Sequence, residues 1–170
     1  MRVEQLFTTP LVITRLNIHD LFLTCMDIEA ENLFGQVRSN LNGYQSTTDV
    51  IFDDRFKQLR EEVEALIRGS FSIEPKIING WVNINRKSGM NRRHIHQGSS
   101  LSAVYYVTDA YSPIRFHDPR PMNVWENGPT THDFTPSKGE IIIFPSWLDH
   151  DVEPNLTDEP RISIAMNVCK

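Results

Sequence analysis

The chain has 170 residues, of which 39% are hydrophobic and 23% are charged, and its net charge is −5. This acidic balance argues against a nucleic-acid partner, because proteins that bind nucleic acids are usually basic, and no apolar run approaches the roughly 20 residues that span a bilayer. Cys25 and Cys169 form neither a disulfide framework nor a CxxC zinc pattern, and the N-terminus lacks the apolar core of a signal peptide, so we expect a cytoplasmic protein.

The first 75 residues are expected to form a strand and two helices. The strand covers residues 11–14, directly after Pro10. A helix over residues 27–41 is predicted from four apolar residues near helical spacing, Ile28, Leu33, Val37 and Leu41. A second helix is capped by Asp53 or Asp54 and ends at Gly69. Its apolar stripe consists of Phe56, Leu59, Val63 and Leu66.

From residue 76 the pattern changes to short strands separated by turn residues. The predicted strands cover residues 76–86, 93–96, 101–108, 114–117, 141–144 and 161–168. The last of them alternates cleanly, with Arg161, Ser163, Ala165 and Asn167 on one face. In the first of them, Trp81, Asn83 and Asn85 likewise share a face.

Several short strands after helices predict a mainly β fold with flanking helices, an antiparallel sandwich or barrel with the helices on one outer face. Without an internal repeat or a linker, residues 1–170 are expected to form a single domain. In this interpretation residues 1–75 are a strand and helical lead-in that packs on the barrel, and residues 76–170 are the barrel core.

Residues 118–137 form the longest stretch without periodicity, and they contain several prolines and Trp125. Loops of this length in compact domains are often lids or binding loops, but an irregular crossover between strands would have the same composition. Both interpretations remain open at this point.

Three histidines carry the chemistry that the sequence suggests. His94 and His96 are one residue apart on an extended segment, so both imidazoles point to the same side, and His150 follows from a distant strand end. Two imidazoles and a carboxylate on one face suit Fe(II) with positions left open. Three histidines with an open fourth position would also suit zinc.

The identity of the third metal ligand has two candidates. Three histidines are favoured first, and the alternative is Asp118 together with His150 and one of the two paired histidines. Asp149 and Asp151 flank His150 but would point away from its side of an extended segment. The remaining histidines, His19, His117 and His132, are expected to have ordinary structural roles.

Arg161 begins the last predicted strand on its polar face, with Ser163 beside it. A guanidinium inside a pocket is costly unless it meets an anion, and with a neighbouring hydroxyl it forms a good fork for a carboxylate. Tyr106 could add a phenol to that anion. The alternative is a rim arginine paired with Asp158 or Glu159, which would contribute little.

These segments resemble the 2-oxoglutarate/Fe(II)-dependent oxygenase superfamily, and more specifically a family of small members often seen in phage and marine bacterial genomes. The matching segments, in chain order, are Trp81–Asn85, His94–His96, Leu101–Val107, Phe116–Arg120, Phe144–Pro154 and Arg161–Asn167. The resemblance spans nearly the whole chain. It departs from the superfamily at His94-Ile95-His96, where the usual motif is His-x-Asp or His-x-Glu.

The resemblance implies a double-stranded β-helix, which is a cupin-like jelly-roll barrel, and a hydroxylase-type reaction. It implies Fe(II) near the barrel mouth and 2-oxoglutarate bound to the metal through its keto acid end. The far carboxylate of this cosubstrate would meet Arg161, with Tyr106 and Ser163 as helpers and Asn83 on the same wall. Polar side chains such as Asn83, Asn85 and Asn167 would orient the imidazoles.

Two other functions fit the same residues. One is a cupin-like zinc or iron enzyme that does not use 2-oxoglutarate, and the other is a non-catalytic barrel that serves as a binding or phage-structural module. The prime substrate is not encoded in a motif, although a basic group near the predicted mouth would favour an anion, namely Arg86, Lys87, Arg92 and Arg93. An exposed edge strand would allow a homodimer. A phage-encoded protein would work in the host cytoplasm.

Overall fold

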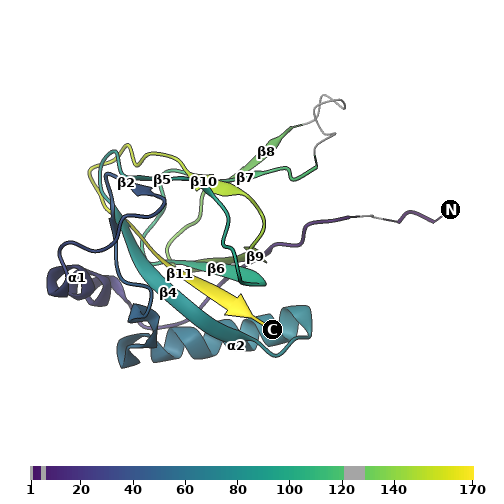
Figure 1. Ribbon diagram of the computed structural model, residues 1–170, viewed down its shortest axis with the longest axis horizontal. Helices are drawn as coiled ribbons and strands as arrows, with labels where there is room; N and C mark the ends of the chain where they lie inside the picture. The colour runs from purple at the N-terminus through teal and green to yellow at the C-terminus, as the bar shows by residue number, and fades with distance from the viewer. Residues whose placement is uncertain (1, 5–6, 121–128) are drawn as a thin grey trace.

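The computed structural model describes residues 2–4, 7–120 and 129–170, which form two antiparallel sheets and two α-helices. The larger sheet has the strand order β1-β9-β6-β11-β4-β3, and the smaller has the order β2-β5-β10-β7-β8. Figure 1 shows the two sheets facing each other, with both helices on the far side of the larger sheet. This arrangement is the double-stranded β-helix that the sequence predicted.

The strands of the larger sheet are β1 (Val12–Arg15), β9 (Glu140–Pro145), β6 (Leu101–Tyr106), β11 (Arg161–Cys169), β4 (Lys76–Asn85) and β3 (Tyr44–Gln45). Those of the smaller sheet are β2 (Asn40–Leu41), β5 (Met90–His94), β10 (His150–Val152), β7 (Ile114–His117) and β8 (Thr131–Phe134). The helices are α1 (Phe22–Glu31) and α2 (Lys57–Phe71), and two short 3₁₀ turns, η1 (Val50–Phe52) and η2 (Asp54–Phe56), precede α2.

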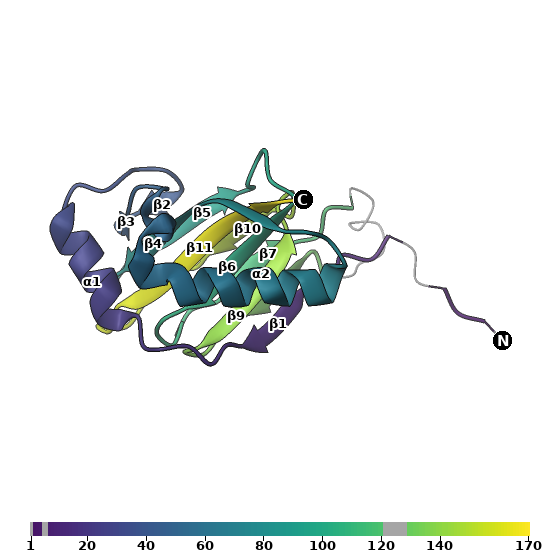
Figure 2. The same cartoon turned by 90° about the horizontal axis from the view of Figure 1, so that it is seen from below.

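The alternation in β11 divides the buried side chains into two layers. Ile162, Ile164 and Met166 belong to the layer that packs against the helices, whereas Ala165 belongs to the layer between the sheets. Figure 2 shows α2 lying across the outer face of the larger sheet. Arg161, Ser163 and Asn167 alternate with the helix-side residues, so the polar face of β11 lies between the sheets.

The first predicted helix is misplaced. Residues 32–39 are not helical, because α1 runs from Phe22 to Glu31 and the chain leaves it at Asn32. Gly35 has a φ of +52°, a left-handed conformation that no regular helix contains. Leu33 and Val37 occur at helical spacing but are 75% and 84% exposed, so the apolar pattern there does not mark a buried face.

The second predicted helix is confirmed, but its end is not. The Asp53 side chain accepts a hydrogen bond from the backbone N–H of Arg55 at the start of η2, and α2 buries Leu59, Val63 and Ile67 completely. The helix continues through Gly69 to Phe71, and its C-cap Ser72 adopts a left-handed φ of 53°. A Cβ atom added at Gly69 would meet no atom within 4 Å, so no close contact requires a glycine at this position.

The long irregular stretch contains a strand that the sequence did not suggest. β8 pairs with β7, so that Phe134 lies opposite Ile114 at the edge of the smaller sheet. Residues 121–128 of the predicted lid, Trp125 among them, lie outside the described residues. Within the described part of the chain, no helix is both long and apolar enough to cross a membrane.

Replacing Leu59 by Ala should lower the free energy of unfolding by about 3 kcal/mol, because it leaves a cavity between α2 and the larger sheet. Urea unfolding followed by circular dichroism measures this loss. Leu23→Ala is the matched control, since Leu23 is 74% exposed on α1 and its replacement should change stability by no more than about 0.5 kcal/mol. Equal effects of the two replacements would contradict the assigned packing of α2.

Candidate active site

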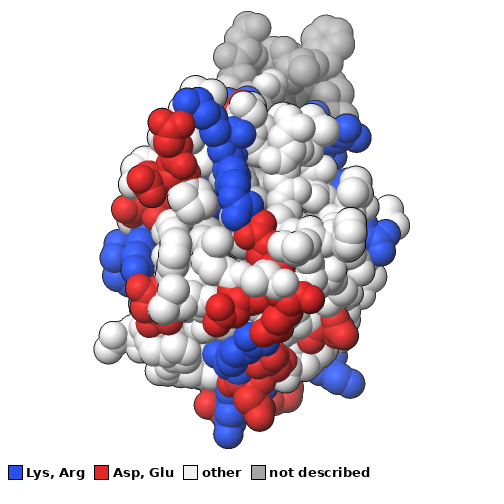
Figure 3. Space-filling view, turned by 90° about the vertical axis from the view of Figure 1, so that its left-hand side faces the viewer, with Lys and Arg blue, Asp and Glu red and all other residues white. Residues whose placement is uncertain are grey.

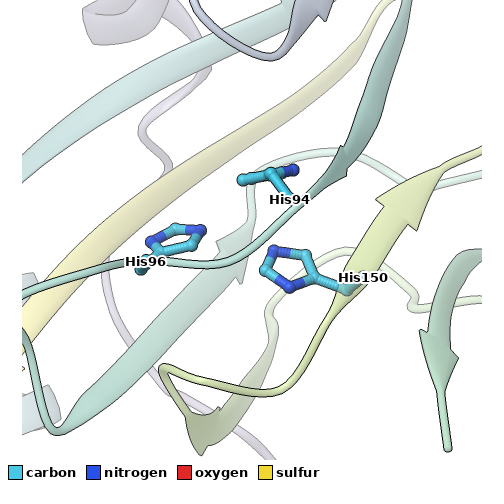
Figure 4. Close-up of side chains that lie close together, drawn as sticks. All are labelled: His94, His96 and His150. Atoms are coloured by element: carbon cyan, nitrogen blue, oxygen red, sulfur yellow. The ribbon is translucent and has the colours of Figure 1, made fainter. Parts of the chain in front are cut away.

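Three imidazoles converge between the ends of two neighbouring strands of the smaller sheet. His94 is the last residue of β5, His96 follows two positions later, and His150 begins β10 directly opposite His94. One potential ligand atom of each residue lies within 4.8 Å of the others. Figure 4 shows the three rings turned toward one another. The ring centroids of His94 and His96 are 5.1 Å apart, as expected for side chains on the same side of an extended segment.

A bulge in β5 gives His94 its direction. His94 pairs with His150 and Asn91 pairs with Val152, so three steps along β5 match two steps along β10. The extra residue lets Asn91 and His94 both face inward, where regular alternation would turn one of them out. Asn91 accepts a hydrogen bond from the side-chain amide of Asn85 at 2.8 Å. The bulge leaves Arg92 and Arg93 exposed.

The hydrogen bonds of the three rings fix which nitrogen remains available. Each Nδ1 lies against an oxygen that can only accept: the Arg92 carbonyl at 2.6 Å, the Asn167 side-chain carbonyl at 2.6 Å and the Leu148 carbonyl at 2.8 Å, for His94, His96 and His150 respectively. Nδ1 therefore carries the proton and donates in each ring. Nε2 is then the unprotonated nitrogen that can bind a metal.

Burial keeps these imidazoles neutral. It lowers the pKa of His96 to about 4 and that of His150 to about 3, and it also lowers the pKa of His94. The Nε2 atom of His96 is buried and has no hydrogen-bond partner among the described residues. Three neutral imidazoles with converging lone pairs, one of them buried and unpaired, fit a divalent transition metal.

The carboxylate candidate does not join this cluster. Asp118 binds the guanidinium of Arg120 at 2.6 Å, which holds the pKa of Asp118 at about 2, and the potential metal-binding group among the described residues consists of the three histidines. Asp149 instead binds Arg93 at 2.6 Å. The remaining histidines are elsewhere: His19 lies 2.6 Å from Gln58, His117 lies 2.5 Å from Asp151, and His132 is in β8.

A cation without an anion lies in the same interior. Arg161 is 2% exposed, and its Nε and one terminal nitrogen have no partner among the described residues. Its guanidinium carbon lies 5.6 Å from the centroid of the Tyr106 ring, and burial lowers its pKa. The rim alternative is wrong, because Asp158 binds Lys87 and Arg161 is not at the surface.

The wall around Arg161 offers further unpaired polar atoms. Ser163 lies opposite Asn83 on one side and Tyr106 on the other in the strand register. The Tyr106 hydroxyl and the Asn83 side-chain carbonyl are buried and have no partner among the described residues. Buried polar atoms are normally hydrogen-bonded, and the guanidinium of Arg161 and the Tyr106 hydroxyl can both donate, so they fit the carboxylate end of a bound molecule. All four residues singled out from the sequence therefore lie on one wall.

Sequence reasoning did not find several supports of the cluster. The Arg92 and Leu148 carbonyls are backbone acceptors and have no residue signature. The Ser102 hydroxyl donates to the side-chain carbonyl of Asn167 at 3.4 Å. The same hydroxyl lies 2.9 Å from the hydroxyl of Ser146, so polar groups surround the Asn167 amide. Only Asn167 itself was signalled, by its place on the polar face of the last strand.

A jelly roll with three converging imidazoles and a buried arginine defines the class of metal-dependent β-helix oxygenases. Residues 79–167 match the family described as "Putative 2OG-Fe(II) oxygenase", and the chain belongs to this family. It is therefore an oxygenase that depends on Fe(II) and 2-oxoglutarate, as the resemblance implied. The phage or marine bacterial origin remains a prediction. No curated protein sequence matches the chain.

Solved structures support the fold. HygX from Streptomyces hygroscopicus, solved with nickel and 2-oxoglutarate bound, is 14% identical with a TM-score of 0.69, over 95% of this chain and 83% of that chain. The epimerase SnoN, in complex with Fe3+, alpha ketoglutarate and nogalamycin RO, is 15% identical with a TM-score of 0.74, over 94% and 78%. A Pseudomonas putida prolyl-4-hydroxylase is 16% identical with a TM-score of 0.69, over 96% and 94%.

The metal-free protein should lose stability as the pH falls from about 6.5 to about 5. The folded state depresses the pKa values of His96 and His150 below the ordinary 6.5, so in this range only the unfolded chain takes up their protons. The free energy of unfolding therefore rises with pH across this window and becomes independent of these groups above it. Urea unfolding at several pH values tests this, and His150→Gln should flatten the dependence. Equal stability of the native sequence at both ends of the window would contradict it.

Asn167→Ala should weaken metal binding about 10- to 100-fold, because His96 loses the acceptor that fixes its tautomer. Isothermal titration of the apoprotein with Ni(II) measures the affinity without requiring turnover. Asn167→Asp retains an oxygen acceptor and should recover most of the affinity. If both variants bind Ni(II) as the native sequence does, the amide has no orienting role.

Proposed function

We propose that His94, His96 and His150 hold Fe(II) through their Nε2 atoms, and that Arg161 binds the distal carboxylate of 2-oxoglutarate in a hydroxylase-type reaction. The single observation that carries this proposal is the buried guanidinium without an anion in the same interior as the three neutral imidazoles. A zinc enzyme without this cosubstrate would leave that cation unexplained.

The proposed roles follow from the chemistry of each side chain. Bound Fe(II) would supply the chemistry of oxygen activation, and the keto acid would supply electrons for it. The three imidazoles would orient the metal and leave its remaining positions open. The hydroxyls of Tyr106 and Ser163 and the side-chain amide N–H of Asn83 would donate to the carboxylate of the cosubstrate beside Arg161, and the apolar residues between the sheets would exclude water.

The replacement of the usual carboxylate ligand by His96 has an electrostatic consequence. Three neutral ligands leave the full charge of a divalent ion uncompensated, whereas a carboxylate would cancel part of it. The dianion 2-oxoglutarate would supply that compensation at the metal and, through its other carboxylate, at Arg161. Cosubstrate binding would therefore neutralise Arg161 and compensate half of the charge of the divalent ion.

Arg161→Met should abolish measurable cosubstrate binding while leaving the metal-free protein at least as stable as the native sequence. A buried cation that lacks an anion opposes folding, so its replacement by an apolar chain of similar length is neutral or stabilising by about 1 to 4 kcal/mol. Anaerobic titration with Fe(II) and 2-oxoglutarate, followed through the visible charge-transfer band, should show at least about a 100-fold loss of affinity.

Arg68→Met is the matched control, because Arg68 is exposed on α2 and binds Glu74 away from the interior. It should leave the charge-transfer band and its titration unchanged. His150→Ala should prevent the band from forming by removing a metal ligand. Normal cosubstrate affinity in Arg161→Met would remove this arginine from the site. Hydroxylation itself is tested by incorporation of labelled oxygen from ¹⁸O₂ into a product formed with equimolar succinate.

A further inference from the structure

A cavity whose lining does not include Arg161 opens beside two of the three imidazoles. It has a volume of about 700 Å³, and its lining includes His94, His96 and Asn167. Cavities of this size hold small molecules. Because two candidate metal ligands form part of its wall, a molecule in this cavity would lie next to the proposed metal.

Three arginines line this cavity, Arg38, Arg92 and Arg93, and the first two come from different segments of the chain. Arg92 lies in the bulge of β5, and Arg38 lies two residues before β2. The backbone N–H of Arg92 donates to the Ser39 carbonyl at 2.8 Å, which holds the two segments side by side. Arg38 comes from the segment predicted as a helix, so its position at this cavity could not be predicted from the sequence.

These arginines differ from their basic neighbours in lacking an acidic partner. Arg86 binds Glu29 at 2.6 Å, Lys87 binds Asp158 at 2.8 Å, and Arg93 binds Asp149 at 2.6 Å. Figure 3 shows one face of the molecule, on which many basic side chains lie next to acidic ones. Among the described residues, neither Arg38 nor Arg92 makes an ion pair, and both are exposed at the cavity.

The inner wall of the cavity is polar and is also incompletely paired. The side-chain carbonyl of Asn79 is buried without a hydrogen-bond partner among the described residues, and Gln45 beside it is 3% exposed. Trp81 adds an aromatic surface that stacks on His96, with ring centroids 5.4 Å apart. The cavity therefore combines two free guanidinium groups, an unpaired acceptor and one aromatic surface.

We propose that the prime substrate is a small molecule with a carboxylate or phosphate group that binds Arg38 and Arg92, which places the rest of the molecule beside the metal. This inference rests on the proposed function, since it names the substrate class of that reaction. Guanidinium groups suit both anions because their planar forks donate two hydrogen bonds at once. A hydrogen-bond donor on the substrate would satisfy Asn79.

The test uses the full chain loaded with Mn(II) and saturating 2-oxoglutarate. The probes are inorganic phosphate, observed by ³¹P NMR, and acetate, observed through its methyl protons, with acetamide as the neutral match for acetate. Because paramagnetic relaxation by Mn(II) falls steeply with distance, only a probe that binds near the metal relaxes faster. Enhanced relaxation of phosphate or acetate, but not of acetamide, is expected, and the responding probe identifies the anion class.

Arg38→Gln and Arg92→Gln should each weaken the responding anion about tenfold, the loss expected for a charge-assisted hydrogen bond. Lys87→Gln is the matched control, because it removes the same charge from an exposed, ion-paired site outside the cavity, and it should change nothing. If both arginine variants relax the anion as strongly as the native sequence does, the anion binds the metal itself and the proposal is overturned. An acetamide response equal to that of acetate would also overturn it.

A different measurement tests the proposed function. Absence of the charge-transfer band of Fe(II) and 2-oxoglutarate in the native sequence would reject that function. The anion measurement, repeated without 2-oxoglutarate, still reports on Arg38 and Arg92 in that case. A normal band together with a negative anion result would reject the substrate class alone.

Discussion

A guanidinium enclosed between two sheets without an anion is the constraint on which the site depends. Such a group opposes folding unless a ligand compensates it, and a protein retains it only where that ligand binds. Arg161 holds this position because the alternation of β11 directs Ile162 and Ile164 to the helices and every second side chain to the interior. The same alternation brings Asn167 to the imidazole of His96. One strand thus supports both ends of the proposed site.

The helices contribute to this chemistry only through the sheet that they cover. α2 buries its apolar face on the outer side of the larger sheet. The larger hydrophobic core therefore lies on that side and not between the sheets. The inner side can then carry unpaired amides, a phenol and an arginine. A single-layer sheet could not do both, since its polar face would lie in water. Because the apolar layer stabilises the fold, the layer between the sheets can contain polar residues.

Features governed by side-chain alternation could be predicted from the sequence, and features governed by backbone detail could not. The shared face of His94 and His96, and the inward position of Arg161, follow from a period of two. The bulge at Arg92 and Arg93 has no signature, because it depends on register with a strand more than fifty residues away. The prediction of a helix over residues 27–41 was wrong because the spacing of apolar residues does not show whether they are buried or exposed. The left-handed conformation of Gly35 also cannot be read from that spacing.

The bulge also links the metal cluster to substrate selection. An unbulged β5 would alternate regularly from Asn91. Either Asn91 would then face outward and Arg92 inward beside His94, or His94 would face outward and Arg93 inward beside Asn91. The extra residue instead keeps Asn91 and His94 inside and leaves two consecutive arginines at the surface. Asp149, the residue before His150, neutralises Arg93 but not Arg92. The strand that positions a proposed ligand therefore also presents an unpaired cation at the adjacent cavity.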